Sequence, residues 1–368
     1  MKVALTYPYC WPEVRRGGER LFHDVARYLT SVGIDVTSVS AQGPGVGPTE
    51  QPGKVVMGRA RPDRRLPRGM VLDRPVTYLP GAARALRRSR PDLVHGMFHL
   101  DGVAARLAFP RTGSAPYFVH VQGMPRRENL DRLPAHRLLF GPSVRRAAAI
   151  LAVSASAAEA LEEEFGLQAR VFHNGVYTEA YAAVAIGDRA PEPLVFFPAD
   201  PGDPRKRLDV LVEAMLRLDP PWQAARLAVA GTAPVDVADR VRNRLGDRVD
   251  FVGPLNEAGM IRAYGETWVT CLPAVREAFG LVIVESLASG RPCVGVRDGG
   301  VAEILTEHRW LAEPDDADSL AAAMGAALAD SEQAESAAAC RQMARPFDWS
   351  VRGPALVDLY RDALGQVH

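Results

Sequence analysis

The sequence predicts an α/β protein made of two domains, each with a mainly parallel sheet covered by helices on both faces. Its 368 residues exceed a usual single core, and 47% of them are hydrophobic, enough to bury two cores. Short apolar or β-branched runs alternate with helical patterns along the chain, an order typical of parallel sheets. A join is predicted at residues 178–193, because Asn174-Gly175 favours a turn and Pro191 and Pro193 break any helix.

The predicted strands are short apolar runs. They cover residues 2–7, 35–41, 93–95, 117–121, 150–153 and 171–173 in the first half, and 194–198, 226–230, 249–252, 268–272 and 292–296 in the second. Residues 42–72 are rich in Gly, Pro and Arg and predict an irregular loop or a short hairpin rather than core. An amphipathic helix is predicted within residues 346–368. The predicted domains are residues 1–180 and residues 190–345.

Charge is unevenly distributed, although the total is zero. Residues 1–180 hold 25 Lys and Arg against 16 Asp and Glu, so the remainder carries an equal acidic excess. Two Arg-rich segments, at residues 59–68 and 84–90, are typical of a solvated surface, and contact with an anionic membrane or an anionic acceptor is the alternative. No nucleic-acid partner is predicted.

Cellular location is inferred from the hydropathy pattern and the cysteines. No apolar run is long enough to span a membrane, and residues 2–7 predict a strand that ends at Pro8 rather than a signal peptide. A cytoplasmic protein is expected, with peripheral contact at the inner membrane face as the alternative. The cysteines lie far apart without metal-ligand spacing and are predicted to be reduced and structural: Cys10, Cys271, Cys293 and Cys340.

Two carboxylates, Glu277 and Glu285, stand eight residues apart around a predicted helix start. Gly280 interrupts the preceding loop, residues 281–288 have helical character, and Gly290 ends the helix. Eight residues of helix rise about 12 Å, which suits a sugar nucleotide lying along the helix start. In this interpretation Glu277 accepts hydrogen bonds from sugar hydroxyls, and Glu285 accepts them from a ribose.

The start of this helix is also a predicted diphosphate site. Its first N–H groups, at Phe279, Gly280 and Leu281, lack intrahelical partners and carry the positive end of the helix dipole. The alternative is a pair of ordinary exposed glutamates. Against that alternative, Glu285 stands in an otherwise apolar run, where an unpartnered carboxylate would be costly to bury.

The run Glu277-Ala278-Phe279-Gly280, with Glu285 five residues beyond it, resembles the EAFGxxxxE signature of retaining glycosyltransferases with the two-Rossmann GT-B fold, especially family 4. Residues 251–255 and 298–303 occur in the family's order, and the resemblance covers nearly the whole chain. It implies two facing Rossmann-like domains, with residues 1–180 on the acceptor side and residues 190–345 binding a nucleotide-sugar donor. It also implies that the helix in residues 346–368 crosses back to the first domain.

Lys206 follows a predicted strand and precedes a predicted helix at residues 208–218, where cations can reach a diphosphate. A metal-free enzyme needs fixed positive charge to stabilise a nucleoside-diphosphate leaving group. The resembling family carries an Arg about five residues before its Lys, where this chain has Pro201, so Arg205 or Arg207 is predicted to substitute. A basic helix start in water is the alternative.

The first half contributes further candidates. Gly17-Gly18 opens a helix after the first strand, and two glycines permit close backbone approach. The resembling family has a similar glycine loop that contacts the phosphate and the acceptor, which implies a donor role for Gly18 and an acceptor role for Gly17. His120 opens a motif similar to the family segment whose His contacts the transferred sugar. His95 and His99 are predicted to line the acceptor side; a plain turn and structurally satisfied histidines are the alternatives.

The second half contributes a glycine and a base pocket. The resemblance implies donor binding by Gly231, at a strand end, and by Val252 and Leu255 in the base-pocket segment. No metal site is predicted, because the sole Asp-x-Asp, Asp316-Ala317-Asp318, opens an Ala-rich helix and is interpreted as helix capping.

The resemblance implies a retaining glycosyltransferase that uses a nucleotide sugar, with UDP preferred, as co-substrate and needs no other cofactor. His120, Lys206 and Glu277 are the predicted catalytic residues. The expected acceptor is a hydroxyl of a small molecule, a lipid-linked molecule or a saccharide. Two mechanisms stay open: same-face attack in which the leaving phosphate oxygen takes the proton, and double displacement through a covalent carboxylate.

Three other classes were weighed against this function. A non-hydrolysing nucleotide-sugar epimerase shares the fold but is expected to carry further acid and base residues. A noncatalytic sugar-nucleotide-binding subunit is expected to lose Glu277 or the Lys, and both are present. A Rossmann dehydrogenase needs Gly-x-Gly-x-x-Gly after the first strand, and residues 7–18 lack it.

Overall fold

The structure is a computed structural model that describes residues 1–9, 17–42, 52–59, 64–65, 71–110, 115–183 and 189–365. The chain divides into two compact units: Met1–Gly175 with Trp349–His368, and Val176–Asp348. Each unit is a parallel sheet with helices on both faces. The predicted α/β class, with two Rossmann-like domains and a C-terminal helix that returns to the first, is confirmed.

The first unit contains a seven-stranded sheet in the order β3-β2-β1-β6-β7-β8-β9. Its strands are β1 (Lys2–Thr6), β2 (Asp35–Gln42), β3 (Lys54–Arg59), β6 (Leu93–Gly96), β7 (Tyr117–Val121), β8 (Ala149–Ala152) and β9 (Arg170–Val171), all paired in parallel. Every residue of β6 and β7 is buried, which is why these strands are continuous apolar runs rather than alternating ones. The strand order reverses between β1 and β6, a position where α/β sheets commonly bind ligands.

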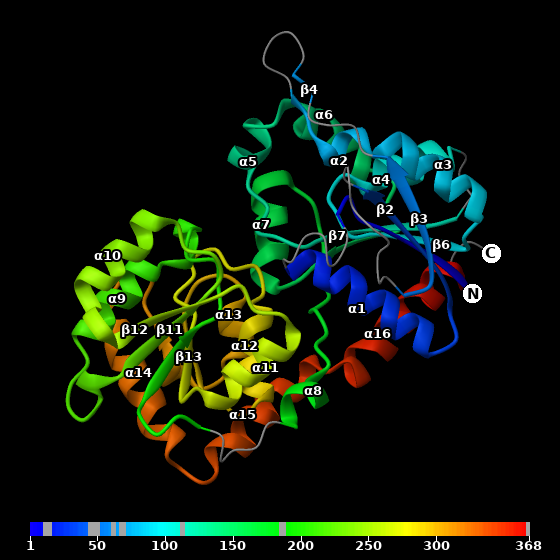
Figure 1. The fold of residues 1–368 in the computed structure, drawn as a ribbon. Helices are drawn as coiled ribbons and strands as arrows, with labels where there is room; N and C mark the ends of the chain where they lie inside the picture. The colour runs from blue at the N-terminus through cyan, green and yellow to red at the C-terminus, as the bar shows by residue number, and fades with distance from the viewer. Residues whose placement is uncertain are drawn as a thin grey trace. The chain divides into compact units, whose positions relative to one another are not determined.

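The helices of the first unit cover both faces of this sheet. They are α1 (Gly17–Ser31), α2 (Arg74–Thr77), α3 (Leu79–Ser89), α4 (Asp101–Ala108), α5 (Arg127–Asp131), α6 (Pro134–Val144), α7 (Ala155–Phe165) and α16 (Trp349–Gly365). Figure 1 shows α1 and α16 on one face and α3, α4 and α6 on the other. The apolar stripe of α1, including Leu21, Val25 and Leu29, is fully buried, as its helical spacing predicts.

Aromatic packing holds α16 in the first unit. Trp349 is 1% exposed and stacks on Tyr28 of α1, with ring centroids 5.5 Å apart. Two glycines make room for these rings. A Cβ on Gly353 would lie 2.0 Å from the Tyr28 ring, and one on Gly175 would lie 2.6 Å from the Trp349 ring. Large side chains therefore fit only because these two positions have none.

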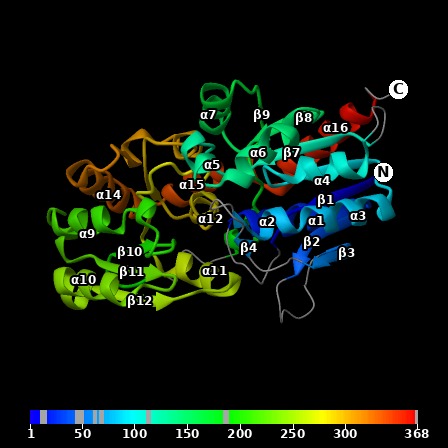
Figure 2. The same ribbon diagram turned by 90° about the horizontal axis from the view of Figure 1, so that it is seen from above.

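The second unit contains a six-stranded sheet in the order β12-β11-β10-β13-β14-β15. Its strands are β10 (Leu194–Phe197), β11 (Arg226–Ala230), β12 (Val249–Gly253), β13 (Val269–Cys271), β14 (Cys293–Val296) and β15 (Leu311–Ala312), again paired in parallel. Figure 2 shows β10, β11 and β12 following one another across the sheet. Here the strand order reverses between β10 and β13.

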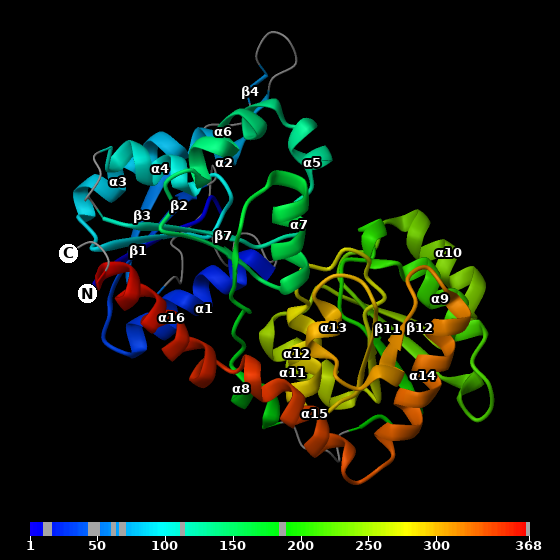
Figure 3. The same cartoon turned by 180° about the vertical axis from the view of Figure 1, so that it is seen from behind.

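The helices of the second unit are α8 (Thr178–Ala182), α9 (Leu208–Leu216), α10 (Val235–Leu245), α11 (Glu257–Glu266), α12 (Leu281–Ala288), α13 (Val301–Ile304), α14 (Ala317–Ser331) and α15 (Ser336–Ala344). Figure 3 shows α9, α10 and α14 on one side of the sheet and α11 and α12 on the other. Sheet positions such as Val195, Val269 and Val294 are therefore buried completely.

The structure corrects the interpretation of residues 42–72. Lys54–Arg59 forms β3, a parallel edge strand paired with β2, so part of this segment belongs to the main sheet. Its short Val55-Val56 run was outweighed in sequence by the surrounding Gly, Pro and Arg. The expected hairpin is present as an antiparallel pair of two-residue strands, β4 (Arg64–Arg65) and β5 (Val71–Leu72).

The boundary between the units also differs from the sequence estimate, because residues 176–180 belong to the second unit. Hydrogen bonds explain this difference. The Val176 amide donates to the Phe347 carbonyl at 2.8 Å, and the Thr178 hydroxyl donates to the Asp348 carboxylate at 2.5 Å. The segment that enters the second unit, at Val176, is therefore hydrogen-bonded to the segment that leaves it, at Asp348.

Cys271, Cys293 and Cys340 are buried free thiols, as predicted, and Cys10 lies outside the described residues. Side chains in the Arg-rich segment at residues 59–68 also lie outside them. The second basic cluster is described, and its four side chains on and after α3 are exposed: Arg84, Arg87, Arg88 and Arg90. Within the described ranges, no helix is both long enough and apolar enough to cross a bilayer.

Candidate active site

Lys206 and Glu277 meet at the carboxyl edge of the second sheet. Lys206 lies in the loop after β10 and Glu277 in the loop after β13, the two strands between which the order reverses. The Lys206 Nζ atom is 2.5 Å from Glu277 Oε2, and both side chains are about four-fifths buried, at 19% and 18% exposure. The fold therefore brings together two predicted site residues that are 71 positions apart.

Local hydrogen bonds fix the position of Lys206. It ends a 3₁₀ turn, Pro204–Lys206, which Asp203 caps by accepting from the Arg205 amide at 3.0 Å. The Arg205 carbonyl accepts from the Val275 amide at 2.9 Å, so the loops after β10 and β13 are bonded to each other. An ammonium group has three donors and Glu277 occupies one, so the same group can also bind phosphate oxygens.

The backbone of Glu277 is held by the loop after β14. The Gly300 amide donates to the Glu277 carbonyl at 2.9 Å, and the Arg276 amide donates to the Asp298 carboxylate at 2.9 Å. Gly299 has a φ of +68°, and a Cβ there would lie 2.1 Å from the Glu277 carbonyl oxygen. A glycine is needed at this position both for its φ and for the close approach.

Arg205 and Arg207, the two candidates for the Arg that the resembling family carries, each pair with a neighbouring carboxylate. Arg205 forms a two-point ion pair with Asp203, with atoms 2.6 and 3.2 Å apart. Arg207, with a left-handed φ of 53°, pairs with Asp315 at 2.6 Å. Both guanidinium groups lie near Lys206 in sequence, but local carboxylates hold them, so Lys206 is the cation that the structure places against Glu277.

Glu285 is buried on α12 with an exposure of 5%. The hydroxyl of Tyr264, from α11, donates to Glu285 Oε2 at 3.0 Å. Burial and the nearby Glu285 charge raise the pKa of Tyr264 well above its usual value, so the hydroxyl stays a donor. Tyr264 was missed in sequence, because nothing in its own helix indicates a carboxylate partner.

The predicted helix start is present at α12. Gly280 is its N-cap residue, with a φ of 96°, and the first helical residue is Leu281. A Cβ on Gly280 would lie 2.9 Å from the Ile283 side chain and 3.7 Å from that of Glu277. Phe279 is buried, and its ring packs against Phe347 at 5.5 Å. The positive end of this helix therefore opens next to Glu277, which precedes it by four residues.

The other predicted donor residues lie at or just after the ends of β11 and β12, at the same edge. The Gly231 amide donates to the Gly253 carbonyl at 2.9 Å, and a Cβ on Gly231 would lie 2.8 Å from Pro201. Val252 is 44% exposed and Leu255 is half-buried. All of these residues stand at carboxyl ends of neighbouring strands, which is the edge that carries Lys206 and Glu277.

In the first unit, Gly17 and Gly18 form the first turn of α1. A Cβ on Gly18 would lie 2.3 Å from the Tyr7 hydroxyl, so the glycine lets Tyr7 pack against the helix start. His120 is the last residue but one of β7 and is 1% exposed. Its Nδ1 atom is 3.3 Å from His95 Nε2, and His95 Nδ1 is 2.7 Å from the hydroxyl of Tyr360 on α16. Burial lowers the pKa of His120 to about 3, so its imidazole is neutral near pH 7.

His99, the predicted acceptor residue, follows β6 and is half-buried. Its Nε2 atom is 3.0 Å from Nδ1 of His136 on α6. The Nε2 atom of His136 is in turn 2.8 Å from the carboxylate of Asp73. Sequence reasoning missed both partners, which lie in segments far from His99 along the chain.

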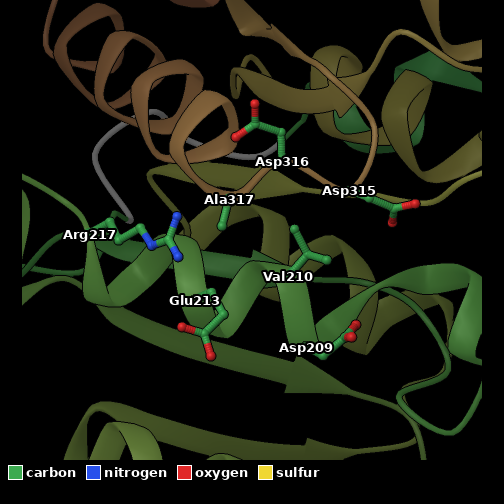
Figure 4. Close-up of a pocket in the computed structure, with 7 residues that line it drawn as sticks. All are labelled: Asp209, Val210, Glu213, Arg217, Asp315, Asp316 and Ala317. Atoms are coloured by element: carbon green, nitrogen blue, oxygen red, sulfur yellow. The ribbon is translucent and has the colours of Figure 1, made fainter.

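A pocket of about 550 Å³ lies in the second unit, beside α9 and the start of α14. Figure 4 shows the residues that line it. It is lined by Asp209, Val210, Glu213, Arg217, Asp315, Asp316 and Ala317. None of the predicted site residues lines it. Asp316 accepts from the Asp318 and Ser319 amides at 2.9 and 3.0 Å, so its predicted role as the cap of α14 is confirmed.

The chain was compared with known proteins. The family model described as Glycosyltransferase Family 4 matches residues 15–180, and the model described as Glycosyl transferases group 1 matches residues 192–330. A phosphatidyl-myo-inositol mannosyltransferase of Propionibacterium freudenreichii is 27% identical over 225 residues, covering 59% of this chain and 57% of that protein. The sulfoquinovosyl transferase SQD2 of Arabidopsis thaliana is 26% identical over 367 residues, covering 90% of this chain and 68% of that protein.

A solved structure shares the fold over the whole chain. The crystal structure of Anabaena HepE in complex with UDP and glucose aligns with a TM-score of 0.75 and 18% identity, covering 98% of this chain and 99% of that one. The chain therefore has a GT-B fold, and its two halves are each similar to a glycosyltransferase family model. Its first unit matches the family 4 model, and its second unit matches the group 1 model.

Proposed function

We propose that this chain transfers a sugar from a nucleoside-diphosphate donor to an acceptor hydroxyl with retention of configuration. The observation that carries this proposal is the Lys206–Glu277 pair, which stands beside the N-terminus of α12 with the buried Glu285 eight residues further on. Fixed positive charge and a helix N-terminus suit the diphosphate of a sugar nucleotide. Two carboxylates at this spacing suit its sugar and ribose hydroxyls.

In the proposed reaction, the acceptor oxygen bonds to the anomeric carbon on the face from which the diphosphate leaves. The bond between that carbon and the phosphate oxygen breaks, and this oxygen takes the acceptor's proton. Lys206 and the N-terminus of α12 stabilise the charge that develops on the diphosphate. Glu277 orients the sugar through its hydroxyls, Glu285 binds the ribose, and neutral His120 contacts the sugar from the first unit. No metal ion is required in this scheme.

The donor in this proposal is a UDP-sugar, a choice supported by the UDP and glucose bound to the HepE protein. The acceptor is a small molecule, a lipid-linked molecule or a saccharide, and the names of the lipid-related relatives support the lipid-linked class. The exposed Arg84, Arg87, Arg88 and Arg90 support contact with an anionic surface, and we propose that the protein works at the cytoplasmic side of a membrane.

The direct test is calorimetry with UDP. Lys206→Ala and Glu285→Gln should each bind UDP at least tenfold more weakly, because each loses a charge-assisted hydrogen bond worth about 1.5 to 3 kcal/mol. Glutamine can still accept from Tyr264, so Glu285→Gln tests the lost charge with little change of packing. Arg226→Ala is the matched control, since this Arg begins β11 at the opposite edge of the sheet, in an exposed pair with Asp250.

Unchanged UDP affinity in both site variants would remove the basis of the proposal. Mass spectrometry of the wild-type protein with a panel of nucleotide sugars then identifies the donor through its slow hydrolysis. Analysis of the anomeric configuration of the transferred sugar tests retention.

A further inference from the structure

A hydrogen-bonded chain of three side chains in the first unit, Asp73, His136 and His99, has no place in the proposed donor chemistry. Asp73 precedes α2, His136 lies on α6, and His99 follows β6, so three separate elements supply it. The distances are 2.8 Å from Asp73 to His136 and 3.0 Å from His136 to His99. His136, in the middle of the chain, is 3% exposed, whereas Asp73 and His99 at its two ends are partly exposed.

The chemistry of the three groups sets the direction of the hydrogen bonds. An ionised carboxylate only accepts, so His136 carries its proton on Nε2 toward Asp73. In a neutral imidazole the other nitrogen, Nδ1, then accepts, and His99 must donate to it from Nε2. His99 is left with an unprotonated Nδ1. Burial, together with the neighbouring His136, lowers the pKa of His99 to about 3, so this nitrogen stays an acceptor near neutral pH.

The surroundings make this arrangement rigid. The Phe98 ring lies 4.1 Å from the His99 ring, between centroids, and Phe140 flanks it at 6.1 Å. Asp73 is itself fixed, because it accepts from the Val76 amide at 3.3 Å as the cap of α2. Hydrogen-bonded partners of this kind commonly fix the orientation and the tautomer of a histidine, so that one particular ring nitrogen faces the substrate.

The location adds a second argument. His99 directly follows β6, and Gly17-Gly18 opens the helix after β1, and these are the two strands between which the order of the first sheet reverses. Ligands of open α/β sheets bind at the carboxyl edge beside such a reversal. In the second unit, the corresponding reversal between β10 and β13 carries Lys206 and Glu277.

We propose that Asp73 and His136 are positioning residues that orient His99, and that His99 Nδ1 accepts a hydrogen bond from the acceptor hydroxyl. This inference rests on the proposed function and assigns the acceptor site of that reaction. The hydrogen bond aims the hydroxyl oxygen, and the proton still leaves to the diphosphate oxygen. His99 therefore recognises a hydroxyl donor, and any acceptor must present one at this edge of the first sheet.

Nitrogen-15 NMR of histidine-labelled protein tests the orientation without any substrate. The expected result is that His99 and His136 both carry the proton on Nε2, and that His136→Phe changes the tautomer distribution of His99. His136→Gln should preserve it, because an amide can donate to Asp73 and accept from His99. Leu138→Ala, an exposed position on the same helix, is the matched control and should change neither signal. A His99 protonated on Nδ1 in the wild-type protein would overturn the inference.

Kinetics test the role in acceptor binding. With UDP-glucose as donor and methyl α-D-glucoside as the acceptor probe, His99→Phe and His136→Phe should lower the ratio of transfer to donor hydrolysis about tenfold. Leu138→Ala, the matched control, should leave both the ratio and donor hydrolysis within a factor of three, and His136→Gln should recover most of the ratio. An unchanged ratio in His99→Phe overturns the inference. A wild-type protein that neither hydrolyses nor transfers from any nucleotide sugar counts instead against the proposed function, and the NMR experiment then decides the inference alone.

Discussion

Glu285 shows how one residue combines burial with chemistry. Its carboxylate is 5% exposed on α12, and the Tyr264 hydroxyl supplies a hydrogen bond that offsets the cost of that burial. Burying a carboxylate this deeply costs folding free energy, and that cost favours a ligand-binding role for Glu285 over a structural one. The same argument separates it from the exposed glutamates of the chain, which need no such partner.

We expect Tyr264→Phe to weaken UDP binding and to destabilise the second unit. Removing the hydroxyl deletes one donor to a buried carboxylate, a loss worth about 1 to 3 kcal/mol of unfolding free energy. The UDP affinity should fall severalfold, because Glu285 is no longer held in one orientation. Denaturant unfolding and calorimetry measure the two effects. A variant with full stability and full UDP affinity would show that Tyr264 does not position Glu285.

His120→Ala should reduce sugar transfer strongly and leave UDP affinity within about a factor of three. In the proposed reaction this residue meets the sugar and makes no contact with the nucleotide. His120 is buried against His95, so His120→Gln serves as a second variant that keeps most of the side-chain volume. Transfer at the wild-type rate by both variants would remove His120 from the mechanism.

Among the secondary-structure elements, the ends of helices form much of the proposed donor site. The N-terminus of α12 opens beside Glu277, and the 3₁₀ turn before α9 ends at Lys206. Two glycines with positive φ, Gly280 and Gly299, hold the connecting loops in conformations that other residues rarely adopt. In the proposed function, one lysine and one helix dipole supply the positive charge for the diphosphate, and the loops that follow β10 and β13 hold both.

Metal independence is the prediction at this scale. Asp316 and Asp318 belong to the cap of α14, where Asp316 accepts from two amides, so they have a structural explanation. Donor hydrolysis should be unchanged by a chelator, and Asp316→Ala should cost about 1 kcal/mol of stability while leaving hydrolysis unaffected. Activity abolished by a chelator and restored by Mg²⁺ or Mn²⁺ would contradict the proposed source of positive charge.

At the scale of the whole chain, the two units differ in where they bury titratable groups. The first unit encloses histidines whose pKa values are lowered by burial: to about 3 for His99 and His120, and well below the usual value for His95. It also encloses Asp101, whose pKa burial raises to about 7 although Tyr78 donates a hydrogen bond to it.

Acidification should therefore destabilise the first unit. Below about pH 6.5 the unfolded chain protonates the three histidines, while the folded unit keeps them neutral to well below that pH. Asp101 acts in the opposite direction, because between its usual pKa and about 7 the folded state holds a proton that the unfolded state has lost. The unfolded state still binds about two more protons, each worth about 1.4 kcal/mol per pH unit, so stability rises with pH in this range.

The measurement is the melting temperature, which should fall by several degrees between pH 7 and pH 5. His95→Gln removes one of the titrating groups and should make the decrease shallower. Equal melting temperatures at the two pH values would contradict the burial of these histidines in neutral form.

The sequence by itself determined the class of fold and nearly all the central strands, and it supplied the candidates for the proposed donor site. These features are local: apolar runs mark parallel strands, and glycine and proline mark the ends of α12. Two edge strands were not predicted: β3, whose short Val55-Val56 run is surrounded by Gly, Pro and Arg, and β15, which has only two residues.

Only the tertiary structure decided which side chains meet. Lys206 pairs with Glu277 because β10 and β13 are neighbours in the sheet, although 71 positions separate the two residues. The same reason explains why three partners were not predicted: Tyr264, Tyr360 and Asp73. The residues next to a side chain in sequence do not indicate which residues it contacts in the folded protein. Strand order and helix packing depend on the whole folded core, and they decide which polar side chains lie close enough to form a site.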